Sequence, residues 1–126
     1  MKRLLIVFLL ISGYSFGQDV IQDTAEEYPS FPGGDQKMRL WIEKEVKYPS
    51  KSSKRGEEGT VYVQFVVWKD GSLGEVKVIR GVSKLLDAEA VRLVKKMPKW
   101  EPAKQAGKAV NCRFTLPIRF VRPRRE

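Results

Sequence analysis

The feature that most constrains the fold is a strict alternation of apolar and other residues near the C-terminal end. Between residues 110 and 120 the even positions are Val110, Cys112, Phe114, Leu116, Ile118 and Phe120. The odd positions between them are Asn111, Arg113, Thr115, Pro117 and Arg119. A period of two predicts a β-strand with one buried face, so the chain must supply neighbouring strands and a cover for that face. In this phase Cys112 lies on the core side, which favours a small buried apolar group over an intermolecular bridge.

The rest of the chain predicts two helices and a β-hairpin. A helix begins at Asp35 and ends before Tyr48-Pro49, with Met38, Trp41, Ile42 and Val46 on one face. Residues 50–59 are expected to form a polar loop. Thr60–Trp68 and Leu73–Arg80 read as strands joined by a turn at Asp70-Gly71, with Tyr62 and Trp68 opposite the core valines. A second helix runs from Leu85 to Pro98, and Trp100 is expected to pack where the next loop crosses the sheet.

This order, helix–strand–strand–helix–strand, predicts an α+β fold. A right-handed crossover places the last strand beside the first, so the expected sheet has three antiparallel strands in the order 2-1-3. Both helices would pack on its apolar face. Pro117 agrees with this arrangement because proline in a strand belongs at a sheet edge. An edge strand exposes N–H and C=O groups that another extended chain can pair with, so the last strand is the predicted binding element.

The composition argues against catalysis. The chain has no histidine and one cysteine, which excludes a histidine triad, a Cys/His zinc site and a multi-disulfide scaffold built from this chain alone. The acidic pair Glu57-Glu58 reads as solvated surface, and the segment from Lys104 to Lys108 lacks the spacing of a phosphate-binding loop. We therefore predict a binding protein with no enzymatic activity, cofactor or metal.

The N-terminal segment is typical of an export signal. A basic start, the apolar run Leu4–Ile11 and small residues at Ser15 and Gly17 predict a signal peptide over residues 1–17, with Gln18 at the mature N-terminus. The alternative is an uncleaved anchor in the inner membrane that leaves the domain facing the periplasm. Residues 18–30 are expected to form an acidic flexible arm that lies on the basic domain, followed by a domain over residues 31–120 and a basic tail over residues 121–126.

The net charge of +9 is unevenly distributed. Residues 36–126 contain 22 basic and ten acidic residues, whereas residues 18–35 contain five acidic residues and no basic one. An exported protein rarely meets nucleic acid, so anionic envelope material such as peptidoglycan or lipopolysaccharide is the expected counterpart, unless the charge only keeps the surface soluble. Tyr62 and Trp68 are either a partner or dimer surface, or residues covered by a terminal arm.

Several short motifs together resemble the TonB C-terminal domain family, and most closely its Bacteroidetes branch. In chain order they are Phe31-Pro32-Gly33-Gly34, Lys47-Tyr48-Pro49, Gly59-Thr60-Val61-Tyr62-Val63-Gln64-Phe65, Asp70-Gly71, Leu86-Asp87-Ala88-Glu89-Ala90, Met97-Pro98-Lys99-Trp100-Glu101-Pro102, Gly107-Lys108 and Leu116-Pro117-Ile118-Arg119-Phe120.

The resemblance implies a periplasmic domain that captures the TonB box of outer-membrane transporters by strand addition beside the last strand. Arg113 and Arg119 would then tune specificity, with Asn111, Thr115 and Pro117 beside them. The family's second contact region follows the Tyr-Pro pair, where its best-studied member has glutamine and this chain has Ser53.

The chain departs from the family pattern in the N-terminal parts that couple full TonB proteins to their energy source. Full TonB proteins have an N-terminal membrane helix and a long proline-rich spacer, in place of which this chain has a predicted signal peptide and a short arm. A cleaved protein would act as an adaptor, a competitor for receptor boxes or a subunit of an anchored inner-membrane complex, and it could also form a homodimer. The rival hypothesis is a structural envelope protein that binds peptidoglycan or lipopolysaccharide through its basic surface. Neither the receptor nor its cargo is predicted.

Overall fold

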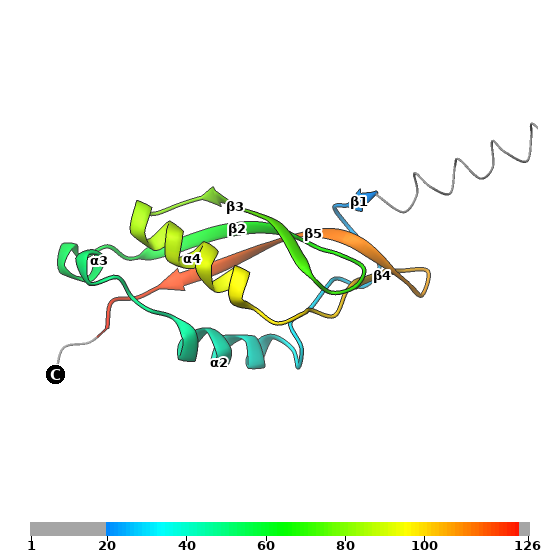
Figure 1. Cartoon of the computed structure of the whole chain (residues 1–126), viewed down its shortest axis with the longest axis horizontal. Helices are drawn as coiled ribbons and strands as arrows, with labels where there is room; N and C mark the ends of the chain where they lie inside the picture. Colours follow the sequence, from blue (N-terminus) through cyan, green and yellow to red (C-terminus); the bar gives the residue numbers. More distant parts are fainter. Residues whose placement is uncertain (1–19, 124–126) are drawn as a thin grey trace, which may run out of the picture.

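A computed structural model describes residues 20–123, which form a twisted sheet with helices packed on one face (Figure 1). The predicted signal peptide and the last three residues of the basic tail lie outside this range. The elements are β1 (Ile21–Gln22), α2 (Asp35–Glu45), α3 (Ser50–Arg55), β2 (Gly59–Val67), β3 (Leu73–Arg80), α4 (Lys84–Lys96), β4 (Ala103–Gln105) and β5 (Lys108–Phe120). The strand order is β1-β5-β2-β3, and β4 pairs with β5 outside this path.

The prediction of an α+β fold is confirmed, but the prediction of a three-stranded sheet is wrong. The sheet has five strands, and β1 pairs with β5 in parallel. The three predicted strands do occupy adjacent places in the predicted order, as β3-β2-β5. The additional strands β1 and β4 have two and three residues, too few to show a period of two.

The predicted loop over residues 50–59 is also wrong in its first half, where α3 forms a short helix from Ser50 to Arg55. This helix has no apolar face, so periodicity could not reveal it. It ends at Gly56, whose φ of 73° is the left-handed conformation that favours glycine after a helix.

The hairpin between β2 and β3 forms as predicted. Four alternate side chains of β2 are completely buried, namely Val61, Val63, Phe65 and Val67. In the turn, the Asp70 carboxylate accepts hydrogen bonds from the Ser72 amide (2.9 Å) and hydroxyl (2.6 Å). Gly71 has φ 91°, and its carbonyl accepts a bond from the Trp100 amide (2.8 Å). A Cβ at residue 71 would lie 2.5 Å from the Trp100 carbonyl oxygen, so only glycine fits there.

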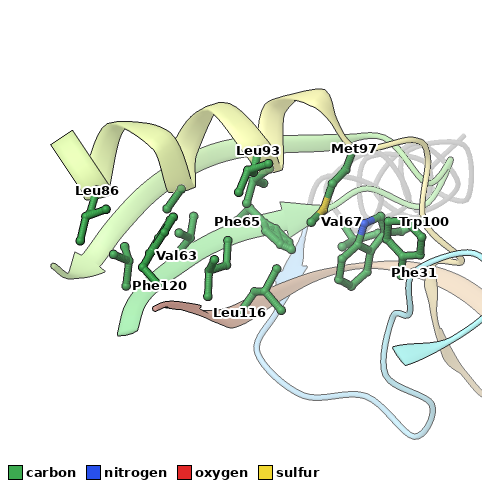
Figure 2. Packing of buried hydrophobic residues seen from close by; sticks show 14 residues of the cluster. Phe31, Val63, Phe65, Val67, Leu86, Leu93, Met97, Trp100, Leu116 and Phe120 are labelled. Carbon is green, nitrogen blue, oxygen red and sulfur yellow. The ribbon is translucent and has the colours of Figure 1, made fainter. Parts of the chain in front are cut away.

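Helix α4 covers this apolar face (Figure 2). Its N-cap is Ser83, whose hydroxyl accepts a hydrogen bond from the Leu86 amide, and its buried face includes Leu86 and Leu93. At the other end of the core Trp100 packs edge-on against Phe65, with ring centroids 5.2 Å apart, and it is 4% exposed. Trp100 therefore packs in the core as the sequence predicts. Cys112 is likewise completely buried and free of a disulfide.

Candidate strand-addition site

One edge of β5 is free over most of its length. On one side β2 pairs with β5 in a regular antiparallel register from Gly59↔Phe120 to Val67↔Cys112. On the opposite side β1 pairs only with Asn111 and Cys112. Within residues 20–123, no strand pairs with this side of β5 between Arg113 and Phe120. These eight residues give an open edge of about 26 Å at the usual rise of a strand.

Pro117 indicates which backbone groups face the open side. It lies opposite Tyr62 in the ladder with β2, and a proline is tolerated there because its nitrogen points away from the partner strand. Backbone N–H groups alternate in direction along a strand. The amides of Arg113, Thr115 and Arg119 therefore point outward. The Arg113 amide faces the end of β1, and an added strand can accept hydrogen bonds from the amides of Thr115 and Arg119.

A cleft of about 610 Å³ lies beside this edge, between α2 and β5. Most of its lining is apolar, with charged groups interspersed; the residues are Asp35, Met38, Arg39, Ile42, Glu43, Phe114, Leu116, Pro117, Ile118, Arg119 and Val121. The side chains of an added strand alternate between the two faces of the sheet. Every second side chain of such a strand would enter the cleft, and the others would lie beside Arg113 and Arg119.

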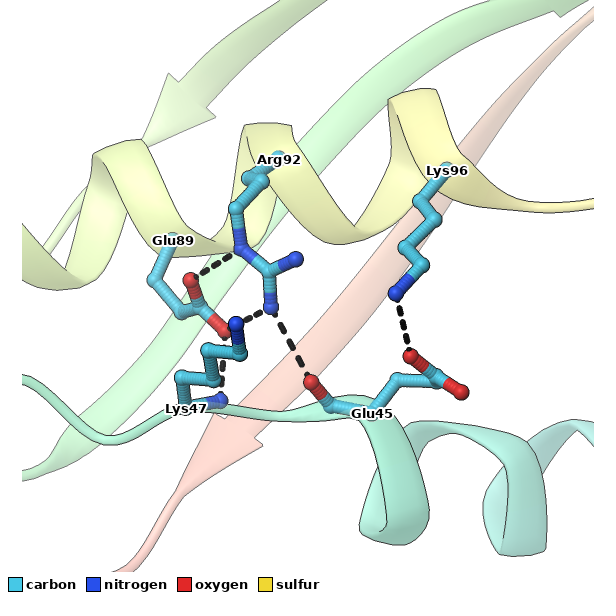
Figure 3. A network of polar contacts seen from close by, with 5 residues as sticks. All are labelled: Glu45, Lys47, Glu89, Arg92 and Lys96. Atoms are coloured by element: carbon cyan, nitrogen blue, oxygen red, sulfur yellow. Dashed lines mark hydrogen bonds and ion pairs between the residues drawn. The ribbon is translucent and has the colours of Figure 1, made fainter.

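Helix α2 forms the outer wall of the cleft, and polar contacts at the C-terminal end of this helix hold it in place (Figure 3). None of the residues of α2 is fully buried. The Glu89 carboxylate of α4 accepts hydrogen bonds from the Lys47 amide (2.7 Å) and from Arg92 (2.7 and 2.8 Å). Arg92 also donates to the Glu45 carbonyl (3.0 Å), and Lys96 pairs with the Glu45 carboxylate (2.6 Å). The cleft wall is thus fastened to α4.

The Glu89 carboxylate is 7% exposed, yet it is stabilised in its charged form. Burial alone would raise its pKa, but the hydrogen bonds from Arg92 and the Lys47 amide outweigh burial and hold the pKa below its ordinary value of 4.5. For Glu45 the hydrogen bond from Lys96 likewise lowers the pKa.

Four of the six predicted site residues lie together along the open edge. Thr115, Pro117 and Arg119 are exposed, and Arg113 is half-buried. All four share the sheet face opposite the helices, because they alternate with the buried side chains of Leu116, Ile118 and Phe120.

The other two predicted residues lie at opposite ends of this edge. Asn111 is 5% exposed and is engaged within the chain, where its side chain accepts from the Lys69 amide (2.8 Å) and donates to the Val20 carbonyl (3.2 Å). Ser53 is on α3, and its carbonyl accepts a bond from Arg122 (3.2 Å), just beyond the C-terminal end of β5.

Sequence reasoning missed the cleft, because it assigned Met38 and Ile42 on α2 to the core. In the structure both are only partly buried, and both line the cleft. Both also pack against the core cluster, so the apolar spacing of α2 correctly indicates the face that turns inward but does not show that this face is left partly open. A second omission is the ion pair between Asp23 and Arg113 (2.5 Å), which no local pattern could reveal.

No group of three or more His, Cys, Asp or Glu side chains that could hold a metal ion occurs among residues 20–123. Over the same range, none of the helices has both the length and the apolar character needed to cross a membrane.

These features define a class of protein: a small α+β domain whose terminal strand presents a free edge beside a helix-walled cleft. Residues 44–121 match the family model described as the Gram-negative bacterial TonB protein C-terminal, over more than half of the chain, and the chain belongs to this family. Members of the family are non-enzymatic interaction domains of the bacterial envelope, associated with TonB-dependent transport and with outer-membrane receptors.

Solved structures agree with this assignment. A TonB C-terminal domain from Pseudomonas aeruginosa is 32% identical, with a TM-score of 0.50, and the match covers 64% of this chain and 82% of that one. A TonB C-terminal domain from Helicobacter pylori is 24% identical, with a TM-score of 0.53, and shows the same fold over 71% of this chain and 95% of that one. No curated relative matches this chain.

Proposed function

We propose that this chain is a periplasmic, TonB-like binding module that engages the TonB box of outer-membrane TonB-dependent transporters by β-strand addition. The observation that carries this proposal is the free edge of β5 from Arg113 to Phe120, which lies beside the apolar cleft. Backbone hydrogen bonds along the edge supply affinity for any extended segment, and the cleft and the arginines select among side chains. In this role the module serves energy-dependent transport.

A proline substitution at the edge tests the proposal. Thr115→Pro removes one of the outward N–H donors, whereas Thr115→Val keeps the donor and removes only the hydroxyl group. Binding of fluorescein-labelled TonB-box peptides from the transporters of the source bacterium is measured by anisotropy. We expect Thr115→Pro to weaken binding by about fivefold to tenfold, the effect of one lost hydrogen bond, and Thr115→Val to bind like the wild type. Unchanged binding by a folded Thr115→Pro variant, with its fold checked by circular dichroism, would refute strand addition at β5.

The open face of the sheet supports a second candidate, a structural envelope protein that binds peptidoglycan or lipopolysaccharide. This face exposes Lys77, Arg80 and Arg119, and the Arg80 guanidinium carbon lies 5.9 Å from the Tyr62 ring centroid. A hollow of about 270 Å³ beside Gln64 and Arg113 lies on the same face. Affinity for an anionic glycan at such a surface should fall steeply as salt rises, whereas strand addition should weaken only mildly, so a salt titration separates the two functions.

A further inference from the structure

Part of the chain already occupies one end of the proposed docking edge. Strand β1 pairs in parallel with β5, with Ile21 opposite Asn111 and Gln22 opposite Cys112. Directly after β1, the Asp23 carboxylate lies 2.5 Å from the Arg113 guanidinium. The open edge therefore begins at Arg113, the residue that forms the ion pair with Asp23.

The segment after β1 is fastened to the domain as well. The Glu26 amide donates to the Gln105 side chain (3.0 Å), and the Glu26 carboxylate accepts from the Ala106 amide (2.7 Å). Glu27 and Lys104 exchange two backbone hydrogen bonds (3.1 and 2.9 Å). These contacts keep β1 close to β5 even when its own pairing opens, so β1 competes for the edge as an intramolecular strand.

We propose that β1 and Asp23 form an internal stop that limits the edge available to a partner to residues 113–120. The inference rests on the proposed function and goes beyond it, because it predicts a maximal useful length for the bound segment. A partner strand of up to eight residues fits beside β1. A longer strand that runs toward Asn111 must first displace β1, so its additional hydrogen bonds replace existing ones and add little affinity.

The exposure of the ion pair indicates that this stop can be displaced. The Asp23 side chain is 77% exposed and that of Arg113 is 34% exposed, so solvent screens their attraction. Only two residues of β1 pair with β5. Two substitutions should therefore release β1. Asp23→Lys replaces the attraction to Arg113 with repulsion, and Gln22→Pro removes the backbone N–H of β1 that the parallel register directs at β5, without a change of charge.

The test is a length series of peptides on the full chain. Nested peptides from the tightest-binding TonB-box segment are lengthened from five to twelve residues, at the N-terminal end in one series and at the C-terminal end in another, so that one series runs toward Asn111. In that series the wild-type affinity should stop rising at about eight residues. In Asp23→Lys and Gln22→Pro the affinity should keep rising, to at least about threefold tighter binding at twelve residues. The control Glu27→Lys makes the same change of charge as Asp23→Lys without breaking the ion pair, and it should behave like the wild type.

Hydrogen exchange followed by mass spectrometry supplies a second measurement. Exchange of residues 20–23 in the wild type should increase when the twelve-residue peptide binds and stay unchanged when the eight-residue peptide binds. Identical length curves in the wild type and both release variants would overturn the stop while leaving strand addition intact. If no peptide binds any variant at any length, the proposed function itself is refuted, and the stop with it.

Discussion

The contacts of Glu89 with Arg92 and Lys47 make a sharp prediction about what holds the cleft open. In Glu89→Ala the carboxylate that accepts from the Lys47 amide and from Arg92 is absent, whereas the Arg92 bond to the Glu45 carbonyl can remain. The control is Glu45→Ala, which removes only the ion pair with Lys96, a side chain that is 52% exposed.

The structure sets the size of the effect. Breaking a fully buried ion pair by removal of one partner costs about 3–5 kcal/mol, and a hydrogen bond to a charged group contributes about 1.5–3 kcal/mol. The Arg92 side chain is 37% exposed, so water partly replaces the lost carboxylate. We therefore expect Glu89→Ala to lower the free energy of unfolding by about 2 kcal/mol, which lowers Tm by about 10 °C in a domain of this size. Glu45→Ala should cost no more than about 0.5 kcal/mol, as is usual for exposed pairs.

Urea unfolding followed by tryptophan fluorescence measures these changes, because Trp100 is in the core and Trp41 packs against it. The dependence of the free energy on urea should keep the same slope in all three proteins. Glu89→Ala should also weaken TonB-box peptide binding more than Glu45→Ala does, since the wall of the cleft loses its main attachment to α4. If the two variants are equally stable, the reasoning about Glu89 is refuted.

Three further predictions concern the core and the titration of buried groups. The pKa of Glu89 lies below 4.5 in the folded protein, so the contribution of Glu89 to the free energy of unfolding is present above about pH 4.5 and is lost as pH falls through the lowered pKa. The difference in the free energy of unfolding between the wild type and Glu89→Ala, measured by urea unfolding, should shrink over that pH range. Phe65→Ala, at a completely buried ring, should cost about 3–5 kcal/mol in the same urea assay, and a cost below 1 kcal/mol would contradict the packing. Burial raises the pKa of the Cys112 thiol, so a colorimetric thiol reagent should react with it only after unfolding, and rapid reaction of the native protein would show that the site opens.

The elements that sequence could predict are those with a repeated local pattern. Periods of two in β2 and β5 and the turn at Asp70-Gly71 predict three strands and their order, and the spacing of Leu86, Ala90 and Leu93 predicts α4. The phase of β5 also places Cys112 on the buried face and Arg113, Thr115, Pro117 and Arg119 on the opposite face. In each case a few neighbouring residues contain the whole signal, so no knowledge of distant contacts is needed.

The elements that sequence could not predict depend on contacts between residues far apart in the chain. Strand β1 has two residues, and what holds it is the Asn111 side chain 91 positions away and the Asp23–Arg113 pair 90 positions away. The cleft depends on how α2 is placed beside β5, and the contacts that fasten the end of α2 to α4, such as those of Glu89 with Lys47 and of Arg92 with Glu45, join residues 42 and 47 positions apart.

This division explains why a strand edge can be found from sequence while its occupant cannot. Alternation along β5 defines two faces and two edges, and Pro117 indicates which edge lacks a partner strand. Any segment with free backbone groups satisfies that edge, because backbone hydrogen bonds do not depend on side-chain identity. In the proposed function the competition between β1 and a bound segment then depends on side chains beside the edge, among them the acid that pairs with Arg113. Within the chain that acid is Asp23, so a partner strand that runs past residue 113 toward Asn111 has to compete with this ion pair as well as with the pairing of β1.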